Sequence, residues 1–177
     1  FGWDTAGKLA PEQAGARRGR STVENVMKLV EGAHRALADE KPNVTLLVDF
    51  VKAFDKVPHN RLLLKLEEMG TPRSALRWLR NFLKDRTARV AVDGELSEEV
   101  KFHRGVPQGT VLGPLLFLAF VNDLVGMVAQ AGPASVSQLL YVDDLAIQAT
   151  ADSWQELTDG MSPVLKALED WCGENSM

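Results

Sequence analysis

Two adjacent carboxylates, Asp143 and Asp144, lie between two short apolar runs, and this feature constrains the fold more than any other. Residues 136–142 and 145–150 have the length and composition of strands, and only a tight turn fits between them. We therefore expect an antiparallel hairpin with the acidic pair at its tip. Neighbouring like charges repel each other unless water or a cation screens them, so the pair indicates either a bare surface turn or a divalent-metal site.

A third carboxylate, Asp49, follows an almost unbroken apolar run at residues 44–48. Such a run, which is partly β-branched, is typical of a central strand buried on both faces. The sequence thus predicts one carboxylate at the end of a buried strand and two at a hairpin tip.

Helical patterns surround these strands. Ser21 and Glu24 form a predicted capping box for a helix that Lys41-Pro42 ends. The apolar positions that recur on this helix are Val23, Met27, Val30, His34 and Leu37. A second helix is expected over residues 62–69, with Asn60 as its N-cap.

Between Thr71 and the acidic hairpin the pattern changes several times. We expect a helix from Pro72 to about residue 83, strands at residues 87–92 and 96–103 around the Asp93-Gly94 turn, and a long helix at residues 114–131. After the hairpin, Asp152 and Ser153 predict the start of a helix that runs to about residue 171, which Gly160 and Pro163 should break or kink.

Composition narrows the class of protein. The 177 residues, 45% hydrophobic, suit one globular domain or a piece of a larger protein. The longest apolar run, residues 111–121, is far shorter than the roughly 20 residues that span a bilayer, so no membrane segment is expected. One cysteine, Cys172, suits a reducing compartment. Both ends look cut from a longer polypeptide.

The net charge of −4 argues against a dedicated nucleic-acid clamp, yet the basic residues are unevenly placed. One cluster lies at residues 17–20, and another would follow one face of the helix after Pro72. The members of the two clusters are Arg17, Arg18 and Arg20, and Arg73, Arg77, Arg80 and Lys84.

Four stretches together resemble a known family. DFVKAFD at residues 49–55, RGVPQGTVLGP at 104–114 and YVDD at 141–144 resemble motifs A, B and C of reverse transcriptases, in that order and spacing. QAGARRGRST at residues 13–22 looks like the fingers block of non-LTR retrotransposon and group II intron enzymes. The resemblance covers nearly the whole chain, and motif details favour the non-LTR enzymes, with a group II intron-type enzyme as the alternative.

The resemblance implies an α+β fold, the palm of a right-hand polymerase, in which an antiparallel sheet is backed by helices. Residues 1–42 would be partial fingers, 43–59 palm with motif A, 60–106 a fingers insertion and 107–177 palm with motifs B and C. The thumb and flanking domains would be absent. The isolated fragment is therefore expected to be weakly active or inactive.

The resemblance also implies RNA-templated DNA synthesis with two Mg²⁺ ions, or Mn²⁺ in their place. Asp49, Asp143 and the main-chain carbonyl of Phe50 would bind metal, with Asp144 in a supporting role because strand alternation points it elsewhere. The residues that would contact the incoming nucleotide are Phe50, Phe54, Gln108 and Gly109, with Phe54 against its sugar. Arg17, Arg18, Arg20 and Arg104 would contact template or triphosphate. For Asp55, a structural role is favoured over metal binding.

The implied partners are an RNA template, a DNA primer, deoxynucleoside triphosphates and other domains of the same polyprotein, with no membrane. The implied location is intracellular, cytoplasmic and nuclear. Two other classes stay open from the residues: a decayed, non-catalytic nucleic-acid-binding remnant, and a metal-binding phosphoacceptor domain. The phosphoacceptor domain would need a parallel sheet, against which the two predicted hairpins argue.

Overall fold

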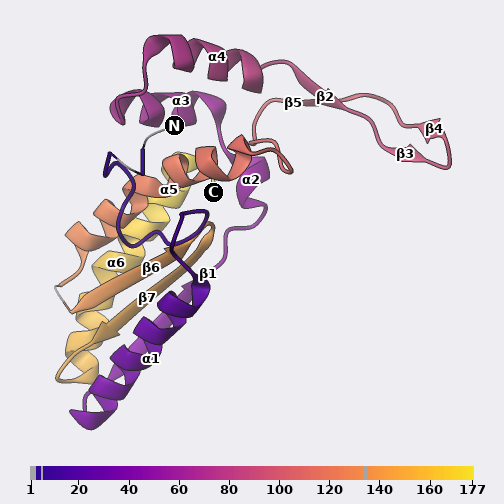
Figure 1. Ribbon diagram of the computed structural model, residues 1–177. Helices are drawn as coiled ribbons and strands as arrows, with labels where there is room; N and C mark the ends of the chain where they lie inside the picture. The colour runs from indigo at the N-terminus through magenta and orange to yellow at the C-terminus, as the bar shows by residue number, and fades with distance from the viewer. Residues whose placement is uncertain (1–2, 5, 134) are drawn as a thin grey trace.

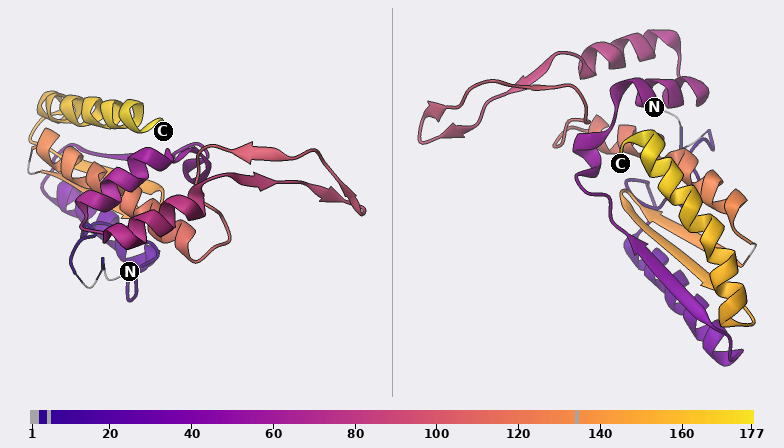
Figure 2. Two further views of the ribbon diagram at one scale, coloured as in Figure 1. Left: turned by 90° about the horizontal axis from the view of Figure 1, so that it is seen from above. Right: turned by 180° about the vertical axis from the view of Figure 1, so that it is seen from behind.

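A computed structural model describes residues 3–4, 6–133 and 135–177. At its centre is a three-stranded antiparallel sheet with the order β1 (Asn43–Val48), β7 (Asp144–Thr150), β6 (Val136–Tyr141). Helix α1 (Thr22–Ala38) lies on one face, while α5 (Leu112–Ala131) and α6 (Trp154–Asn175) pack against each other on the opposite face (Figures 1 and 2). This arrangement confirms the expected α+β class.

Three shorter helices and a two-stranded arm lie between β1 and α5. Helix α2 (Ala53–Lys56) contains the end of motif A, and α3 (His59–Glu68) packs against both α4 (Arg73–Leu83) and α5. The arm is built from β2 (Arg86–Ala88), β3 (Ala91–Val92), β4 (Glu95–Leu96) and β5 (Val100–Phe102), and it projects away from the sheet (Figures 1 and 2). At its tip, Asp93 and Gly94 both have positive φ, as the predicted tight hairpin requires.

The prediction that residues 44–48 form the central strand is wrong. β7 occupies the centre, and five successive residues of it, 145–149, are buried. β1 lies at the edge, its exposure alternates, and 74% of Leu47 is exposed. An apolar run shows that a strand can be buried, but which strand becomes central depends on pairing with residues about a hundred positions away.

Ser21 caps α1 as predicted, whereas the Glu24 carboxylate of the expected capping box pairs with Arg20 and Lys28. The buried face of the helix was predicted wrongly. Ser21 accepts a hydrogen bond from the main-chain N–H of Glu24. The helix meets the sheet through Asn25, Leu29, Gly32 and Ala36, and a Cβ on Gly32 would collide with the side-chain oxygen of Gln148. The apolar residues of the predicted face are instead exposed: Val23, Met27, Val30 and Leu37.

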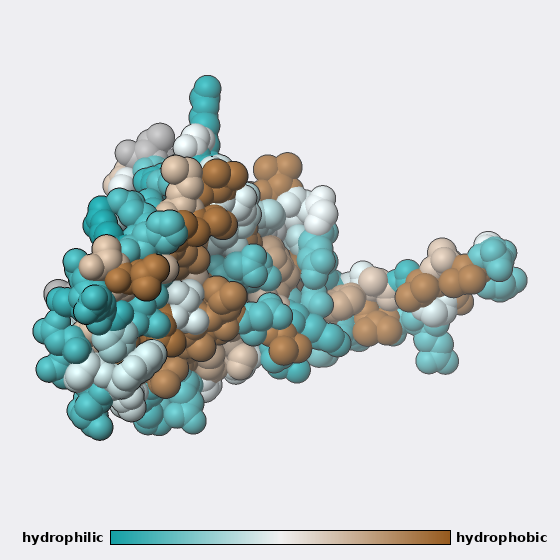
Figure 3. All heavy atoms as spheres, turned by 90° about the horizontal axis from the view of Figure 1, so that it is seen from below, coloured by the Kyte–Doolittle hydropathy of each residue, from teal (hydrophilic) through white to brown (hydrophobic). Residues whose placement is uncertain are grey.

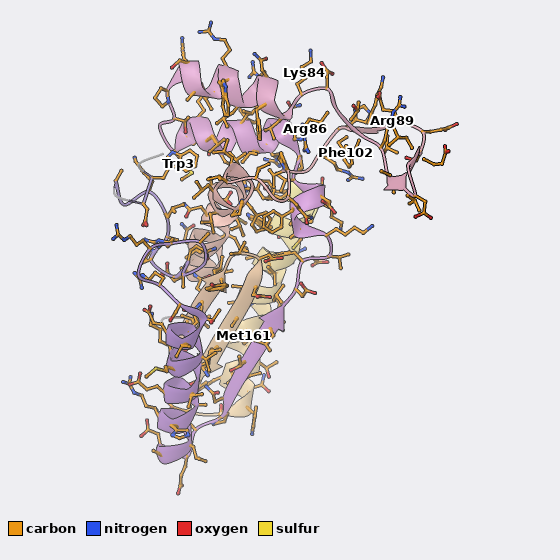
Figure 4. All side chains as sticks on the ribbon, turned by 45° about the vertical axis from the view of Figure 1, so that its right-hand side comes forward. Trp3, Lys84, Arg86, Arg89, Phe102 and Met161 are labelled. Carbon is orange, nitrogen blue, oxygen red and sulfur yellow. The ribbon has the colours of Figure 1, made fainter. Side chains whose placement is uncertain are left out.

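The sequence predicts a break or a kink of α6 at Gly160 and Pro163, and the structure excludes the break, because the helix continues through both residues. Met161, Val164, Leu168 and Trp171 are buried on one side of it. Figure 4 shows Met161 beside the sheet. Burial on both sides of the proline outweighs the loss of one helical hydrogen bond. Two further helices begin slightly earlier than predicted. Helix α3 begins at His59, directly after Pro58 and before the predicted Asn60 cap, and α5 begins at Leu112 rather than at residue 114.

A buried amine ties α3 to α5 and α6. Lys65 is 8% exposed, and its Nζ donates to the carbonyl of Phe120 at 2.8 Å and to Asp123 at 2.9 Å. The same nitrogen lies 4.8 Å from the ring centroid of Trp171, whose indole N–H also donates to Asp123. Burial lowers the pKa of Lys65, while the hydrogen bond to Asp123 opposes that shift.

Helix α5 is long and apolar enough to cross a membrane on those two criteria. In this fold its side chains supply much of the core, including Leu116, Phe117, Phe120 and Leu124, each fully buried. Residues of α3, α4, α5, α6 and the sheet join in one hydrophobic cluster. The division of the chain into fingers and palm segments stays a prediction.

Candidate active site

The predicted hairpin is formed, with Val142 and Asp143 as its two turn residues. Tyr141 pairs with Asp144, so Asp144 is the first residue of β7 rather than part of the tip. Val142 has a φ of 61°, and Asp143 is not among the residues with positive φ, which is the sign pattern of a type II′ turn. Glycine usually holds the first turn position, and a β-branched residue there carries strain of about 1–3 kcal/mol.

Strand register brings Asp49 to the same end of the sheet. Val48 pairs with Leu145, so the residue after Val48 lies beside the start of β7. Burial raises the pKa of Asp143, and the negative charges of Asp144 and Asp49 raise it further, against a hydrogen bond from the main chain of Asp143. Asp143 therefore lies close enough to Asp144 and Asp49 for their negative charges to act on it.

These carboxylates fit a hard divalent cation that is completed by other ligands. Within residues 3–4, 6–133 and 135–177, no three acidic, histidine or cysteine side chains gather closely enough to hold a metal ion unaided. Mg²⁺ commonly takes one or two carboxylates, with substrate phosphates and water as its remaining ligands. Carboxylates that share a site and repel each other, as Asp49 and Asp143 do, are the donors such a cation neutralises.

The loop of motif B is packed against motif A. Gln108 donates from Nε2 to Asp55 Oδ1 at 3.0 Å, and the N–H of Val106 donates to the carbonyl of Phe54 at 2.8 Å. Gly105 has a φ of 90°, and a Cβ there would lie 2.7 Å from the carbonyl oxygen of Asp55. Asp55 lies in α2 and accepts this bond, while its assignment to a structural role over metal binding stays a prediction. Gly109 has a φ of 75° with open space around its Cα, so its main chain is accessible to a ligand.

The two phenylalanines of motif A lie differently. Phe50 is buried, with its ring 5.8 Å from that of Trp171, and its carbonyl accepts a hydrogen bond from Ala53 N–H at 3.1 Å. A carbonyl oxygen has a second lone pair, so a metal contact by Phe50 stays a prediction. Phe54 is half-buried, and its ring stacks on that of Phe117.

The four arginines assigned to template or triphosphate have different environments. Arg17 is engaged within the chain, where it donates to Asp4 and to the carbonyls of Ala10 and Gln13, and these bonds use four of its five N–H groups. Arg20 pairs with Glu24 at 3.0 Å, and Arg18 is exposed.

Arg104 lines a small cavity at the base of the arm, together with Gln108 and Arg86. Arg86 lies over the ring of Phe102, with its guanidinium carbon 5.8 Å from the centroid, and Figure 4 shows both side chains at the base of the arm. All four arginine assignments stay predictions. Apolar side chains are also exposed along the arm (Figure 3), namely Val90, Val92, Leu96, Val100 and Phe102.

Two residues of this site received no role from the sequence. The side-chain amide of Gln13 forms hydrogen bonds with both main-chain groups of Val142, and Gly15 lies directly against the same turn. Both belong to the stretch that resembles the fingers block, but nothing in the local pattern shows that they meet a hairpin 129 positions away.

The sheet is antiparallel, is backed by helices and carries carboxylates at one end, and a glycine-rich loop packs against motif A beside it. This arrangement has the form of a polymerase palm. The chain belongs to the reverse transcriptase (RNA-dependent DNA polymerase) family, whose sequence model matches residues 4–177.

Similar proteins come from insect transposons. The probable RNA-directed DNA polymerase from transposon BS of Drosophila melanogaster is 34% identical over 93% of this chain, and the RNA-directed DNA polymerase from mobile element jockey of the same species is 33% identical over 90%. The Pol polyprotein from the type-1 retrotransposable element R2 of Popillia japonica is 27% identical over 81%. The chain spans about a fifth of the length of these relatives, 18%, 18% and 21% respectively.

Solved structures support the fold. Apo telomerase from Candida tropicalis, truncated from its C-terminal domain, superposes with a TM-score of 0.62 at 14% identity, over 92% of this chain and 32% of that one. Telomerase from Candida albicans, solved with a fragment of telomeric RNA, gives a TM-score of 0.53 at 15% identity, over 89% and 29% of the two chains. At these identities the likeness concerns the fold alone.

Proposed function

We propose that this chain is the catalytic palm of a longer RNA-directed DNA polymerase of a non-LTR retrotransposon. The observation that carries the proposal is the meeting of Asp49 and Asp143 at adjacent strand ends, in a site where burial and neighbouring charge raise the pKa of Asp143. The family membership and the transposon relatives support the same activity.

In the proposed reaction, a primer 3′-hydroxyl attacks the α-phosphate of a deoxynucleoside triphosphate, and pyrophosphate leaves. When divalent cations are bound, they lower the pKa of the attacking hydroxyl, and their positive charge stabilises the leaving pyrophosphate. Asp49 and Asp143 would hold two Mg²⁺ ions, or Mn²⁺, with the Phe50 carbonyl as a further ligand and Asp144 in support. Gln108 and Gly109 would meet the incoming nucleotide.

The proposed partners are an RNA template, a DNA primer and further domains of the same polypeptide. The proposed location is intracellular, in the cytoplasm and the nucleus. The relative named as a Pol polyprotein is consistent with additional domains, and the exposed apolar faces of α1 and the arm offer them contact surfaces.

Primer extension by the longer polypeptide that carries this chain tests the proposal. Extension of a DNA primer on an RNA template should require Mg²⁺ or Mn²⁺ and all four deoxynucleotides. A polypeptide that binds the primer–template but extends it on neither RNA nor DNA would instead match a decayed remnant.

A further inference from the structure

The segment at residues 12–15 runs beside the outer edge of β6. Gln13 forms a parallel bridge with Leu140, whose N–H donates to the carbonyl of Glu12 at 3.0 Å. The N–H of Ala14 donates in return to the carbonyl of Leu140 at 2.8 Å. The segment therefore extends the sheet by a short additional partner next to the catalytic hairpin.

Beyond this bridge, the side-chain amide of Gln13 takes the place of a strand's main chain and forms hydrogen bonds with the main chain that follows β6. Gln13 is 2% exposed, and its Oε1 accepts from the N–H of Val142 at 2.9 Å and from that of Gly15 at 2.8 Å. Its Nε2 donates to the carbonyl of Val142 at 3.2 Å. One amide thus binds both main-chain groups of the strained turn residue.

Neighbouring residues fix the position of this amide. Arg17 donates to the carbonyl of Gln13 at 2.9 Å, which anchors the main chain of the segment. A Cβ on Gly15 would collide with the main-chain nitrogen of Val142, so only glycine allows this close approach. The contact between the segment and the turn is therefore specific in both chemistry and shape.

We propose that Gln13 is a positioning residue that holds Val142 in its left-handed conformation and so orients the carboxylate of Asp143, the next residue. The proposal rests on the proposed function for its catalytic consequence. Without the amide, Val142 can relax to negative φ, which rotates the peptide that precedes Asp143 and moves its carboxylate. Gln13 itself touches neither substrate nor metal in this scheme.

The geometric part is tested on this chain by amide hydrogen exchange. Gln13→Met keeps the length of the side chain and removes its hydrogen bonds, so the Val142 amide should exchange about tenfold faster or more. The matched control is Gln138→Met, because Gln138 is 7% exposed, lies on β6 and donates to Val125 on α5, away from the turn. Unchanged exchange at Val142 in Gln13→Met, or an equal increase in the control, would overturn the proposal.

The catalytic part is tested by single-nucleotide incorporation in the longer polypeptide. Gln13→Met should lower kcat about 10- to 100-fold with little change in the nucleotide KM, since displacement of a reacting group costs rate rather than binding. The loss should be several-fold smaller when the polypeptide also carries Val142→Gly, because glycine adopts positive φ without support.

Equal losses with and without the Val142→Gly substitution would show that Gln13 does not act through the turn. If the wild-type polypeptide extends no primer at all, the proposed function fails, while the exchange experiment still decides whether Gln13 holds the turn.

Discussion

The ring of Phe54 stacks on the ring of Phe117, with centroids 4.8 Å apart and planes inclined by 24°. Phe117 is fully buried in α5, whereas Phe54 is only half-buried. Stacking on this buried ring fixes the orientation of the Phe54 ring, so the exposed side of Phe54 is a rigid surface. A rigid ring could act as a steric gate, that is, a side chain that excludes ribonucleotides by clashing with their 2′-hydroxyl. A ring that only fills the core would stack on Phe117 in the same way.

Phe54→Val separates the two roles. A gate predicts that ribonucleotide insertion improves while deoxynucleotide insertion is largely kept, because relief of a clash acts on the competitor's transition state. A core role predicts a stability loss of about 1–3 kcal/mol with both nucleotides affected alike. Single-nucleotide insertion efficiencies for the two sugars, compared between wild type and variant, measure the difference.

The matched control is Phe82→Val. Phe82 is also half-buried and stacks on an aromatic ring, that of Trp78 at 5.4 Å, but it lies on α4. The Phe82→Val variant should lose a similar amount of stability without any change in sugar preference. An unchanged ratio in Phe54→Val would mean that Phe54 is not the gate.

Asp49→Asn and Asp143→Asn should each lower DNA synthesis by about a hundredfold or more, because each removes a charged donor from the proposed metal site. Asp49 is exposed and Asp143 half-buried, so neither substitution opens a cavity, and thermal unfolding should change little. Asp144→Asn should be milder or comparable.

Primer extension and thermal unfolding, measured on the same preparations, check the carboxylate prediction. Asp159→Asn, an exposed change on α6, provides the control for the loss of one negative charge. Near wild-type extension by the Asp143 variant would contradict the two-metal assignment.

The local features of the fold could be predicted from the sequence because neighbouring residues determine them. The acidic hairpin, the Ser21 cap and the Asp93-Gly94 turn each depend on a few adjacent residues, and all three are present. The positions of the carboxylates could be predicted for the same reason, since Asp49 follows a recognisable strand and Asp143 and Asp144 lie between two others.

The features that could not be predicted depend on distant contacts. The periodicity of α1 indicates an apolar stripe, but the close approach of Gly32 to Gln148 determines which face meets the sheet. Likewise, Gln13 looks like any polar residue until the sheet edge brings it to Val142. Local pattern gives the elements, and long-range packing decides which of their surfaces are used.

Lys65 should make stability depend on alkaline pH. Its pKa is lowered in the folded chain, whereas the unfolded chain keeps a value of about 10.4, so between the two values the unfolded state binds more protons. The contribution of Lys65 to stability is therefore greatest above about pH 10.4 and is lost as pH falls through the lowered pKa.

Denaturant unfolding from about pH 7 to 10.5 checks this dependence. Wild type should gain stability relative to Lys65→Met as pH rises. Lys166→Met is the control, because hydrogen bonds to Asp170 and Glu169 raise the pKa of Lys166, so its contribution to stability stays constant up to about pH 10.4 and is lost only above that pH. If the plots of unfolding free energy against pH are parallel for wild type and Lys65→Met, the pKa of the Lys65 amine is not lowered by burial.

The exposed basic stripe on α4 should supply part of any nucleic-acid affinity. With a net charge of −4, the 177-residue chain is expected to bind primer–template weakly, through phosphate contacts that salt screens. Replacing Arg73, Arg77 and Arg80 by Gln should reduce the slope of log K against log salt by about 2 to 3, since each lost phosphate contact is worth about 0.7 to 0.9. Fluorescence anisotropy of a labelled primer–template over a salt series measures the slope.

A control with the same change in net charge distinguishes contact from general attraction. Lys28, Arg35 and Lys41 are already paired with Glu24, Glu31 and Asp152, so their replacement by Gln removes three positive charges outside the stripe. If the stripe binds phosphates, the α4 variant should lose more of the salt slope than this control, because counterion release follows contacts rather than total charge. Equal slopes for the two variants would leave α4 without a role in binding, and tight binding that is insensitive to salt would contradict a phosphate-based contact altogether.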